Sequence, residues 1–388
     1  LLRQLQKIDQ GSLSIKMGKR QLTLGTPSSN HISANIEITN QSFFRKSCLG
    51  GSLGVADSYA DGDWETDDMV GVFRLFLQNQ DVMDGMEGGW ASLLNRIARW
   101  SYLLGQKNTR KGSRKNIALH YDLGNDFYEL MLDPTMTYSC GIFDSPQSTL
   151  EQASLAKYDR IIDQLDIQPH HHVLEIGCGW GGFIEYASLQ GYKVTGITIS
   201  NEQYEFAQSR IKDLPNNPEV VLQDYRLTQG QYDAVVSIEM FEAVGKKYWD
   251  IYFKTLNNVL KKNGKACFQI ITINDDEYSN YINQVDFIQK YIFPGGVLPS
   301  KKILYKLFKE NNFELYEEKS FGKDYAKTLR IWKENFNRSW NDISKNGFDE
   351  KFKNLWNYYL SYCETGFDTQ HTDVSQFYLK KNKIKNLI

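Results

Sequence analysis

The stretch Val173–Gly182, VLEIGCGWGG, decides the fold. It predicts a short buried strand that runs into a glycine-rich turn, and a helical pattern over residues 183–190 follows. Gly177, Gly179 and Gly181 let the backbone turn tightly and approach a ligand without a Cβ in the way. A strand, a glycine turn and a helix in this order open nucleotide-binding α/β domains, although a glycine turn without a ligand has the same pattern.

The spacing of the glycines narrows the class of ligand. It is G-x-G-x-G preceded by Glu175, and it differs from the G-x-G-x-x-G of dinucleotide binders. An acidic residue two positions before such a turn resembles the start of class I S-adenosylmethionine (SAM) methyltransferases. We therefore expect the amides at Gly177 and Gly179, with Glu175, to bind SAM.

Strands and helices alternate from residue 170 onward. The expected strands are 172–176, 193–197, 219–222, 233–238 and 265–271, with helices at 181–190, 201–211 and 247–262. This order predicts an α/β fold with a parallel, doubly wound sheet and ligand sites at the C-terminal ends of the strands. A helical insertion follows the fifth strand and ends at Pro294-Gly295-Gly296. Beyond it we expect a helix at 301–311, a strand at 312–318 and an aromatic-rich helical region at 326–362.

The composition is that of an ordinary globular protein. The chain has 388 residues, 41% of them hydrophobic and 13% aromatic, and a formal net charge of −2. This balance argues against a broadly basic nucleic-acid binder. The five cysteines are scattered without a C-x-x-C pair, so neither a metal site nor a disulfide framework is indicated. No apolar run approaches the roughly 18 residues that span a bilayer, and there is no signal peptide, so we expect a cytoplasmic protein.

Three segments are expected along the chain. Residues 1–105 form a small α+β module, with a hairpin in GSLSIKMGKRQLTLG, a strand in ANIEITN and a helix capped near Thr66–Asp68. Trp64 is either a core anchor or a lipid contact. A helix over 86–105 carries Trp and Leu on one face, for packing or for a membrane interface. Residues 106–118 form a basic linker, either solvated or phosphate-seeking, and residues 119–388 the catalytic domain.

Polar residues follow the predicted strands where a methyl donor would bind. Thr198 and Gln203 follow the second strand and suit a ribose. Asp224 follows the third and could accept from the adenine amino group, with Tyr225 as an apolar wall. Glu242 follows the fourth and places a carboxylate beside the transferred methyl, although it also suits a helix N-terminus.

Ten segments, in order, resemble the cyclopropane fatty acid synthase family, which adds a methylene bridge across the double bond of unsaturated acyl chains. The segments are GSLGVADSYADGDWE, HYDLGNDFYELMLD, TYSCGIF, LEIGCGWGG, GITISNEQ, QDYR, MFEAVG, KYIFPGGVLPS, FGKDYAKTLRIW and YYLSYCETGF. They cover nearly the whole chain.

The resemblance implies roles for particular residues. Cofactor contacts of the family match Tyr138, Ser139, Gly177, Gly179, Thr198, Gln203, Asp224 and Tyr225, and its reaction-centre positions match Cys140, Glu242, Tyr325 and Cys363. By residue type alone, Cys140 and Cys363 also suit buried or pocket-lining roles. In that family a bicarbonate ion, held by a Glu, a His, a Tyr and the backbone near the first Cys, acts as the base.

One position departs from the family pattern. The family has His in the fifth strand, as L-H-T-I, where this chain has Ile271 within FQIITI. Gln269 points to the same face of the strand and could offer an amide instead. Without the His, bicarbonate would bind less well and proton loss from a neighbouring carbon would compete, giving a methylene or methyl branch.

The predicted reaction is methyl transfer from SAM to the cis double bond of unsaturated phospholipid acyl chains, with aromatic faces stabilising the carbocation. Such a substrate implies transient, peripheral membrane contact, which we expect through the helix near Trp100 and the basic linker. The resemblance implies a homodimer, and the charge balance argues against nucleic acid as a partner. Two other classes stay open: a lipid-binding scaffold that lost the chemistry, favoured by Ile271, and a small-molecule methyltransferase, which would have a polar pocket.

Overall fold

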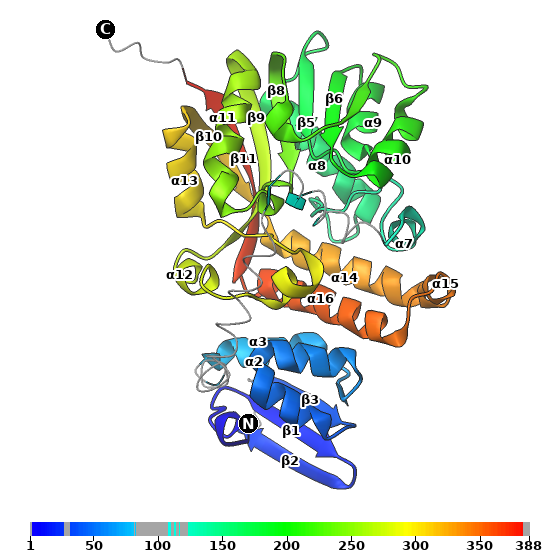
Figure 1. The fold of residues 1–388 in the computed structure, drawn as a ribbon, viewed down its shortest axis with the longest axis vertical. Helices are drawn as coiled ribbons and strands as arrows, with labels where there is room; N and C mark the ends of the chain where they lie inside the picture. The colour runs from blue at the N-terminus through cyan, green and yellow to red at the C-terminus, as the bar shows by residue number, and fades with distance from the viewer. Residues whose placement is uncertain are drawn as a thin grey trace.

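The computed structural model describes residues 2–26, 32–80, 82, 108–109, 112–113, 116 and 123–382. Figure 1 shows three layers along its long axis: a small N-terminal unit, a layer of long helices, and a large sheet flanked by helices. The helices of the middle layer come late in the chain, and the last strand, at residues 372–381, lies in the large sheet again.

The large sheet has seven strands in the order β10-β11-β9-β8-β5-β6-β7. The strands are β5 (His172–Ile176), β6 (Lys193–Thr198), β7 (Glu219–Leu222), β8 (Tyr232–Ile238), β9 (Leu260–Ile273), β10 (Phe313–Ser320) and β11 (Thr372–Lys381). The strands from β9 to β7 are parallel, as predicted. At the other edge β11 is antiparallel to both β9 and β10, so the sheet is mixed, and β11 was not predicted.

The predicted helices of this domain are confirmed with small shifts at their ends. They are α9 (Gly182–Leu189), α10 (Asn201–Ile211), α11 (Trp249–Val259) and α13 (Lys301–Glu310). These helices and α8 (Leu150–Leu165) each contact a strand of the sheet. The start of α8 is a capping box, in which Thr149 and Gln152 each satisfy the other's backbone amide. Shorter elements are α7 (Asn125–Glu129), η1 (Tyr225–Leu227), η2 (Phe241–Ala243), η3 (Lys246–Tyr248), α12 (Tyr278–Tyr281) and η4 (Ile288–Ile292).

The N-terminal unit holds a four-stranded sheet in the order β2-β1-β3-β4. Its elements are α1 (Leu2–Leu5), β1 (Ser12–Met17), β2 (Arg20–Gly25), β3 (Ser33–Ile38), α2 (Ser42–Ala60), β4 (Trp64–Glu65) and α3 (Met69–Gln78). The predicted hairpin is confirmed as β1 and β2, and Asp68 caps α3 by accepting from the amide of Gly71 at 2.8 Å. Trp64 is 3% exposed and donates to Val55 O, so it is a core anchor.

The helical layer comprises α14 (Gly322–Arg338), α15 (Trp340–Lys345) and α16 (Glu350–Asp368). Its buried side chains form one continuous hydrophobic cluster with those of the N-terminal unit. For example, the rings of Phe73 in α3 and Tyr358 in α16 are 4.9 Å apart and nearly perpendicular. This shared core fixes the N-terminal unit against α16.

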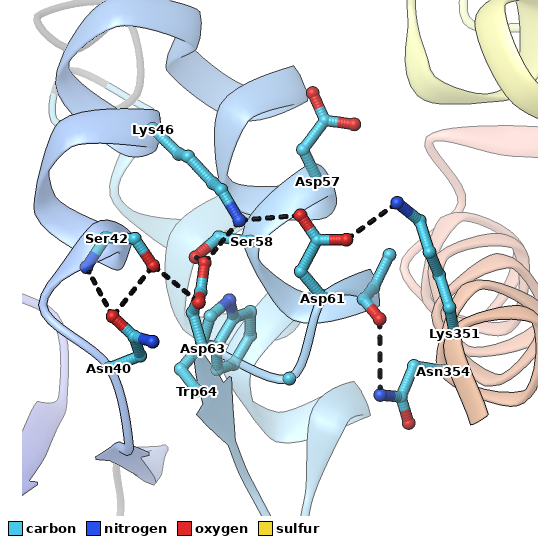
Figure 2. Close-up of polar contacts among 12 residues, drawn as sticks. Asn40, Ser42, Lys46, Asp57, Ser58, Asp61, Asp63, Trp64, Lys351 and Asn354 are labelled. Atoms are coloured by element: carbon cyan, nitrogen blue, oxygen red, sulfur yellow. Dashed lines mark hydrogen bonds and ion pairs between the residues drawn. The ribbon is translucent and has the colours of Figure 1, made fainter.

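Figure 2 shows the polar rim of this contact. Asp61, at the end of α2, accepts from Lys46 at 2.6 Å and from Lys351 of α16 at 2.7 Å. Asp63 accepts from Lys46 as well, at 2.6 Å, and Asp57 accepts from the hydroxyl of Tyr291 in the insertion. The pair between Asp61 and Lys351 is partly exposed, and such pairs contribute only about 0–1 kcal/mol each. The apolar cluster therefore supplies most of the docking energy, and the charges set its orientation.

Some predictions fall outside the described residues. These are the helix over 86–105 with its Trp and Leu face, and most of the basic stretch 106–118. The boundaries of the three predicted segments fall there too, so that division stays a prediction. Within the part of the chain that is described, no helix is long and apolar enough to cross a bilayer.

Candidate active site

One cavity of about 470 Å³ lies at the C-terminal ends of the parallel strands. Its wall is built from the β5–α9 turn, the ends of β6, β7 and β8, part of β9, and side chains of α3, α14 and α16. All nine predicted cofactor residues line it: Tyr138, Ser139, Glu175, Gly177, Gly179, Thr198, Gln203, Asp224 and Tyr225. The structure thus gathers residues from distant parts of the sequence around one space, as the topology of a doubly wound sheet requires.

The glycine turn has the open shape that a bound nucleoside needs. Gly177 and Gly179 have φ of +79° and +52°, in the region that favours glycine. A Cβ on Gly179 would meet no protein atom within 4 Å, so the space in front of this residue is free for a ligand. Glu175 is 3% exposed, and its Oε2 has no hydrogen-bond partner. Burial raises the pKa of Glu175 to about 8, and an ammonium group placed against it would restore the charged form.

The ends of β6 and β7 supply polar groups that are already ordered. The hydroxyl of Thr198 donates to Oε1 of Gln203 at 2.9 Å. The Asp224 carboxylate accepts from Arg226 at both oxygens, at 2.8 and 2.7 Å, so Arg226 holds it in place. The hydroxyl of Tyr225 is buried without a hydrogen-bond partner. These groups, the open space at Gly179 and the unpaired oxygen of Glu175 fit SAM.

The segment before α8 adds two polar side chains and contacts a buried lysine. The hydroxyls of Tyr138 and Tyr359 are 2.9 Å apart, and the ring of Tyr138 lies against Trp332. Ser139 accepts from Lys157 Nζ at 2.7 Å. Lys157 is fully buried, and desolvation lowers its pKa to about 8. Sequence reasoning missed Lys157, because a lysine in the middle of an amphipathic helix normally faces solvent.

The two predicted reaction-centre cysteines differ in their placement. Cys140 is fully buried, its thiol donates to Gly141 O, and it is not one of the residues lining the cavity. What Cys140 offers the site is its backbone amide. Cys363 does line the cavity. Burial raises the pKa of both thiols, so neither has the depressed pKa of a reactive cysteine.

The centre of the site is Glu239, which sequence reasoning did not single out. Its Oε1 accepts from the amide of Cys140 at 2.9 Å and from Gln269 Nε2 at 2.7 Å. Its Oε2 accepts from the hydroxyl of Tyr325 at 2.5 Å. Burial raises the pKa of Glu239, while these donors and Lys157 oppose that shift by stabilising the charged form. The only signal in the sequence was a second carboxylate three residues before Glu242 at the same strand end.

Glu242 lies in the same cavity but in a poorer environment for a charge. Its Oε1 accepts from the amide of Ile271 at 2.5 Å, and its Oε2 is buried without a partner. Burial, and secondly the charge of Glu239, raise the pKa of Glu242 to about 8. The three donors and Lys157 favour the charged form of Glu239, whereas Glu242, with one donor and a pKa of about 8, favours its protonated form, an arrangement typical of paired acid and base groups.

Strand β9 presents Gln269 to this centre. Besides Glu239, its amide donates to Cys140 O at 3.1 Å, and its Oε1 accepts from Gln376 of β11. The family resemblance places the missing histidine at Ile271, but Ile271 contributes its amide to Glu242 and its side chain to the cavity wall. The expectation that Gln269 would offer an amide on this face is confirmed.

The raised pKa of Glu242 predicts a pH dependence of stability. Its folded pKa of about 8 lies above the ordinary 4.5, so its stabilising contribution is present below pH 4.5 and is lost as pH rises toward 8. In Glu242→Gln this loss is absent. We expect the melting temperature of the variant, relative to the wild type, to increase between about pH 5 and pH 9, measured by thermal unfolding. A difference in melting temperature between the variant and the wild type that stays constant with pH would contradict the raised pKa of Glu242.

The sequence of this chain is similar to those of known SAM-dependent enzymes. The model of the family described as mycolic acid cyclopropane synthetase matches residues 108–377. The cyclopropane-fatty-acyl-phospholipid synthase of Escherichia coli is 38% identical over 343 residues, which are 86% of this chain and 84% of that protein. The tuberculostearic acid methyltransferase UfaA1 of Mycobacterium tuberculosis is 35% identical over 339 residues, 85% of this chain and 79% of its own.

A solved structure is similar over the larger domain. It is the mycolic acid cyclopropane synthase CmaA1 complexed with SAH and CTAB, and its TM-score is 0.65 at 30% sequence identity. The match covers 69% of this chain and 98% of that one. The predicted class I SAM methyltransferase fold is thereby confirmed.

Proposed function

The chain belongs to the mycolic acid cyclopropane synthetase family and is a SAM-dependent fatty-acyl methyltransferase, and from that premise we propose a specific reaction. It transfers the methyl group of SAM to the cis double bond of an unsaturated phospholipid acyl chain and closes a cyclopropane ring. The observation that carries the proposal is a single cavity that joins the SAM residues, two buried carboxyl groups and a long apolar wall.

The apolar part of the cavity suits an acyl chain. Its aromatic and aliphatic lining comes from three parts of the molecule: Phe73, Phe76 and Leu77 of α3, Phe293 of the insertion, and Tyr358 and Tyr362 of α16. Such a wall excludes water, and the aromatic faces stabilise a transient cation. A small polar acceptor would leave this surface unfilled, which argues against the small-molecule alternative. An intact set of SAM and carboxylate residues argues against the scaffold alternative.

When bound, SAM supplies an electrophilic methyl group, which the π electrons of the alkene attack directly. The protein's own task is then to hold the double bond in line with that methyl and to keep water from the carbocation on the acyl chain. Ring closure needs a base, because a proton must leave the new methyl group. The C–H electron pair then forms the second bond to the cationic carbon.

The site does not fit the bicarbonate ion that the family resemblance implies. Three of the groups that would hold it are the amide of Cys140, the hydroxyl of Tyr325 and the polar side chain on β9, here Gln269. All three already donate to Glu239. No step of the mechanism is therefore routed through bicarbonate.

A methylene branch is the second candidate product. The similarity to a methyltransferase named for tuberculostearic acid favours it. A hydride shift along the acyl chain before proton loss gives the methylene, an isomer of the ring with the same mass. A saturated methyl branch would need a further hydride from a reductant, which a separate reaction would have to supply.

The test is mass spectrometry of acyl chains after incubation of the purified protein with SAM and monounsaturated phospholipid vesicles. We expect a gain of one methylene unit that resists catalytic hydrogenation, as a ring does under mild conditions. A product that gains this mass but is readily hydrogenated would show that the enzyme forms a methylene branch and not a ring. No mass change, in a protein that still binds SAM, would contradict both products.

Access to such a substrate implies contact with a membrane surface. We also infer reversible, peripheral binding, since the acyl chain must leave a bilayer to enter the cavity. Co-sedimentation of the protein with vesicles measures it. The homodimer that the resemblance implies stays a prediction. The molar mass of the protein in solution, measured by light scattering, tests it.

A further inference from the structure

Glu239 has a backbone conformation that its residue type disfavours. It follows β8 with φ of +49°, in the left-handed region where glycine is usual. Its carboxylate lines the active-site cavity and is desolvated there, while the residue as a whole is partly exposed. A strained backbone that carries a buried charge costs stability, and such positions cluster at functional sites. The side chain must therefore do something that glycine at this position cannot.

The hydrogen bonds of Glu239 define a preformed site for a carboxylate-like anion. Three donors converge on its two oxygens: a backbone amide from the loop before α8, an amide from β9 and a tyrosine hydroxyl from α14. The anion that they hold is covalently part of the chain. It needs no uptake from solution, and it keeps its position through the reaction.

The neighbouring groups hold the negative charge on Glu239. Tyr325, Gln269 and the Cys140 amide all donate to it, and the buried cation of Lys157 attracts it. Glu242 is the nearest competitor and is held neutral by burial and by the charge of Glu239 itself. An ionised carboxylate in a water-excluded cavity is a stronger base than the same group in water, because burial penalises its charged form.

We propose that the carboxylate of Glu239 removes the proton from the transferred methyl group, in the place where a dissolved bicarbonate ion would otherwise act. The C–H bond of that methyl breaks, its electron pair closes the ring on the cationic carbon, and the proton moves to an oxygen of Glu239. The enzyme then works without bicarbonate. This inference rests on the proposed function.

The experiment compares product formation in carbonate-free buffer and with added bicarbonate. We expect the wild type to be equally active in both. Glu239→Gln keeps the shape of the side chain but lacks a basic oxygen, and we expect its rate to fall at least about 100-fold, the usual scale for loss of a general base. Equilibrium binding of SAM, which we expect to be unchanged, shows that the variant is folded.

Glu239→Gly gives the sharper result, because glycine suits the local backbone and leaves the three donors in place around an empty space. We expect it to be inactive in carbonate-free buffer and to regain activity at least about tenfold with bicarbonate, as a soluble base replaces the lost one. Asp166→Gly is the matched control: Asp166 is an exposed carboxylate with φ of +53° at the end of α8, outside the cavity. We expect its activity to be indifferent to bicarbonate.

Each arm has an outcome that overturns the inference. These outcomes are a wild type that needs bicarbonate, a Glu239→Gln variant as active as the wild type, or a Glu239→Gly variant that bicarbonate does not restore. A wild type that forms no product even with bicarbonate contradicts the proposed function instead. The two failures are therefore distinguishable.

Discussion

Replacing Gly179 with leucine is expected to abolish SAM binding while leaving the protein folded. The residue lines the cavity with φ of +52°, and a Cβ there would meet no protein atom within 4 Å. The Cβ therefore meets no protein atom, and we expect the rest of the leucine side chain to occupy the space in front of the glycine turn. Affinity for SAM, measured by calorimetry, should fall at least about 100-fold, or about 2.7 kcal/mol.

Gly191→Leu is the control for the strained backbone. Gly191 has φ of +95°, a Cβ there would likewise meet no protein atom within 4 Å, and the residue is not one of those lining the cavity. The two substitutions carry a similar conformational cost, since both place a side chain at positive φ. We expect Gly191→Leu to lower stability and leave SAM binding intact. Equal affinity in both variants would mean that the cofactor does not bind at this turn.

Tyr325→Phe is expected to lower kcat for ring formation by about 10- to 100-fold, the size of one hydrogen bond to a charged group. The hydroxyl of Tyr325 lies 2.5 Å from Oε2 of Glu239. Among the hydrogen bonds of the described residues, it is the only donor to that oxygen. Without it the carboxylate loses part of its orientation and of its stabilised charge. The ring of Tyr325 stacks on Phe367 at 4.3 Å between centroids, and phenylalanine keeps that packing.

Tyr358→Phe is the matched control for Tyr325→Phe. Tyr358 is also buried and lines the same cavity. It comes from α16 and is not one of the three donors to Glu239. We expect its kcat to stay within about twofold of the wild type. If the two variants lose activity equally, the effect belongs to the cavity wall rather than to the base. SAM affinity should be unchanged in both.

The features that depend on near neighbours were predictable from the sequence. The glycine turn at 177–181 and the parallel strands around it are local patterns, and so is the cap of Asp68 on α3. The cofactor residues follow from the same logic, because the ends of parallel strands meet at one edge of a sheet. All nine line one cavity.

Strand β11 escaped prediction because buried polar residues interrupt its apolar pattern. Ser375 and Gln376 are completely buried and carry no apolar signal. They are satisfied by hydrogen bonds to Ser320 of β10 and to Gln269 of β9. Val374, Phe377, Tyr378 and Leu379 are buried beside them, and a strand that is buried at successive positions has no two-residue alternation by which to detect it. The helix α2 was missed in a similar way, since its sequence is rich in Gly and Ser.

The sequence by itself determined the glycine turn and the alternation of parallel strands and helices, because these are patterns of residues close in the chain. The ordered motifs of the family resemblance indicated the class of chemistry. Only the tertiary structure shows which carboxylate at the end of β8 collects the hydrogen-bond donors. The three donors to Glu239 lie 99, 30 and 86 residues away, at Cys140, Gln269 and Tyr325. Charge state and basicity depend on burial and on such distant partners. No local pattern encodes them, so they arise only when the chain is folded.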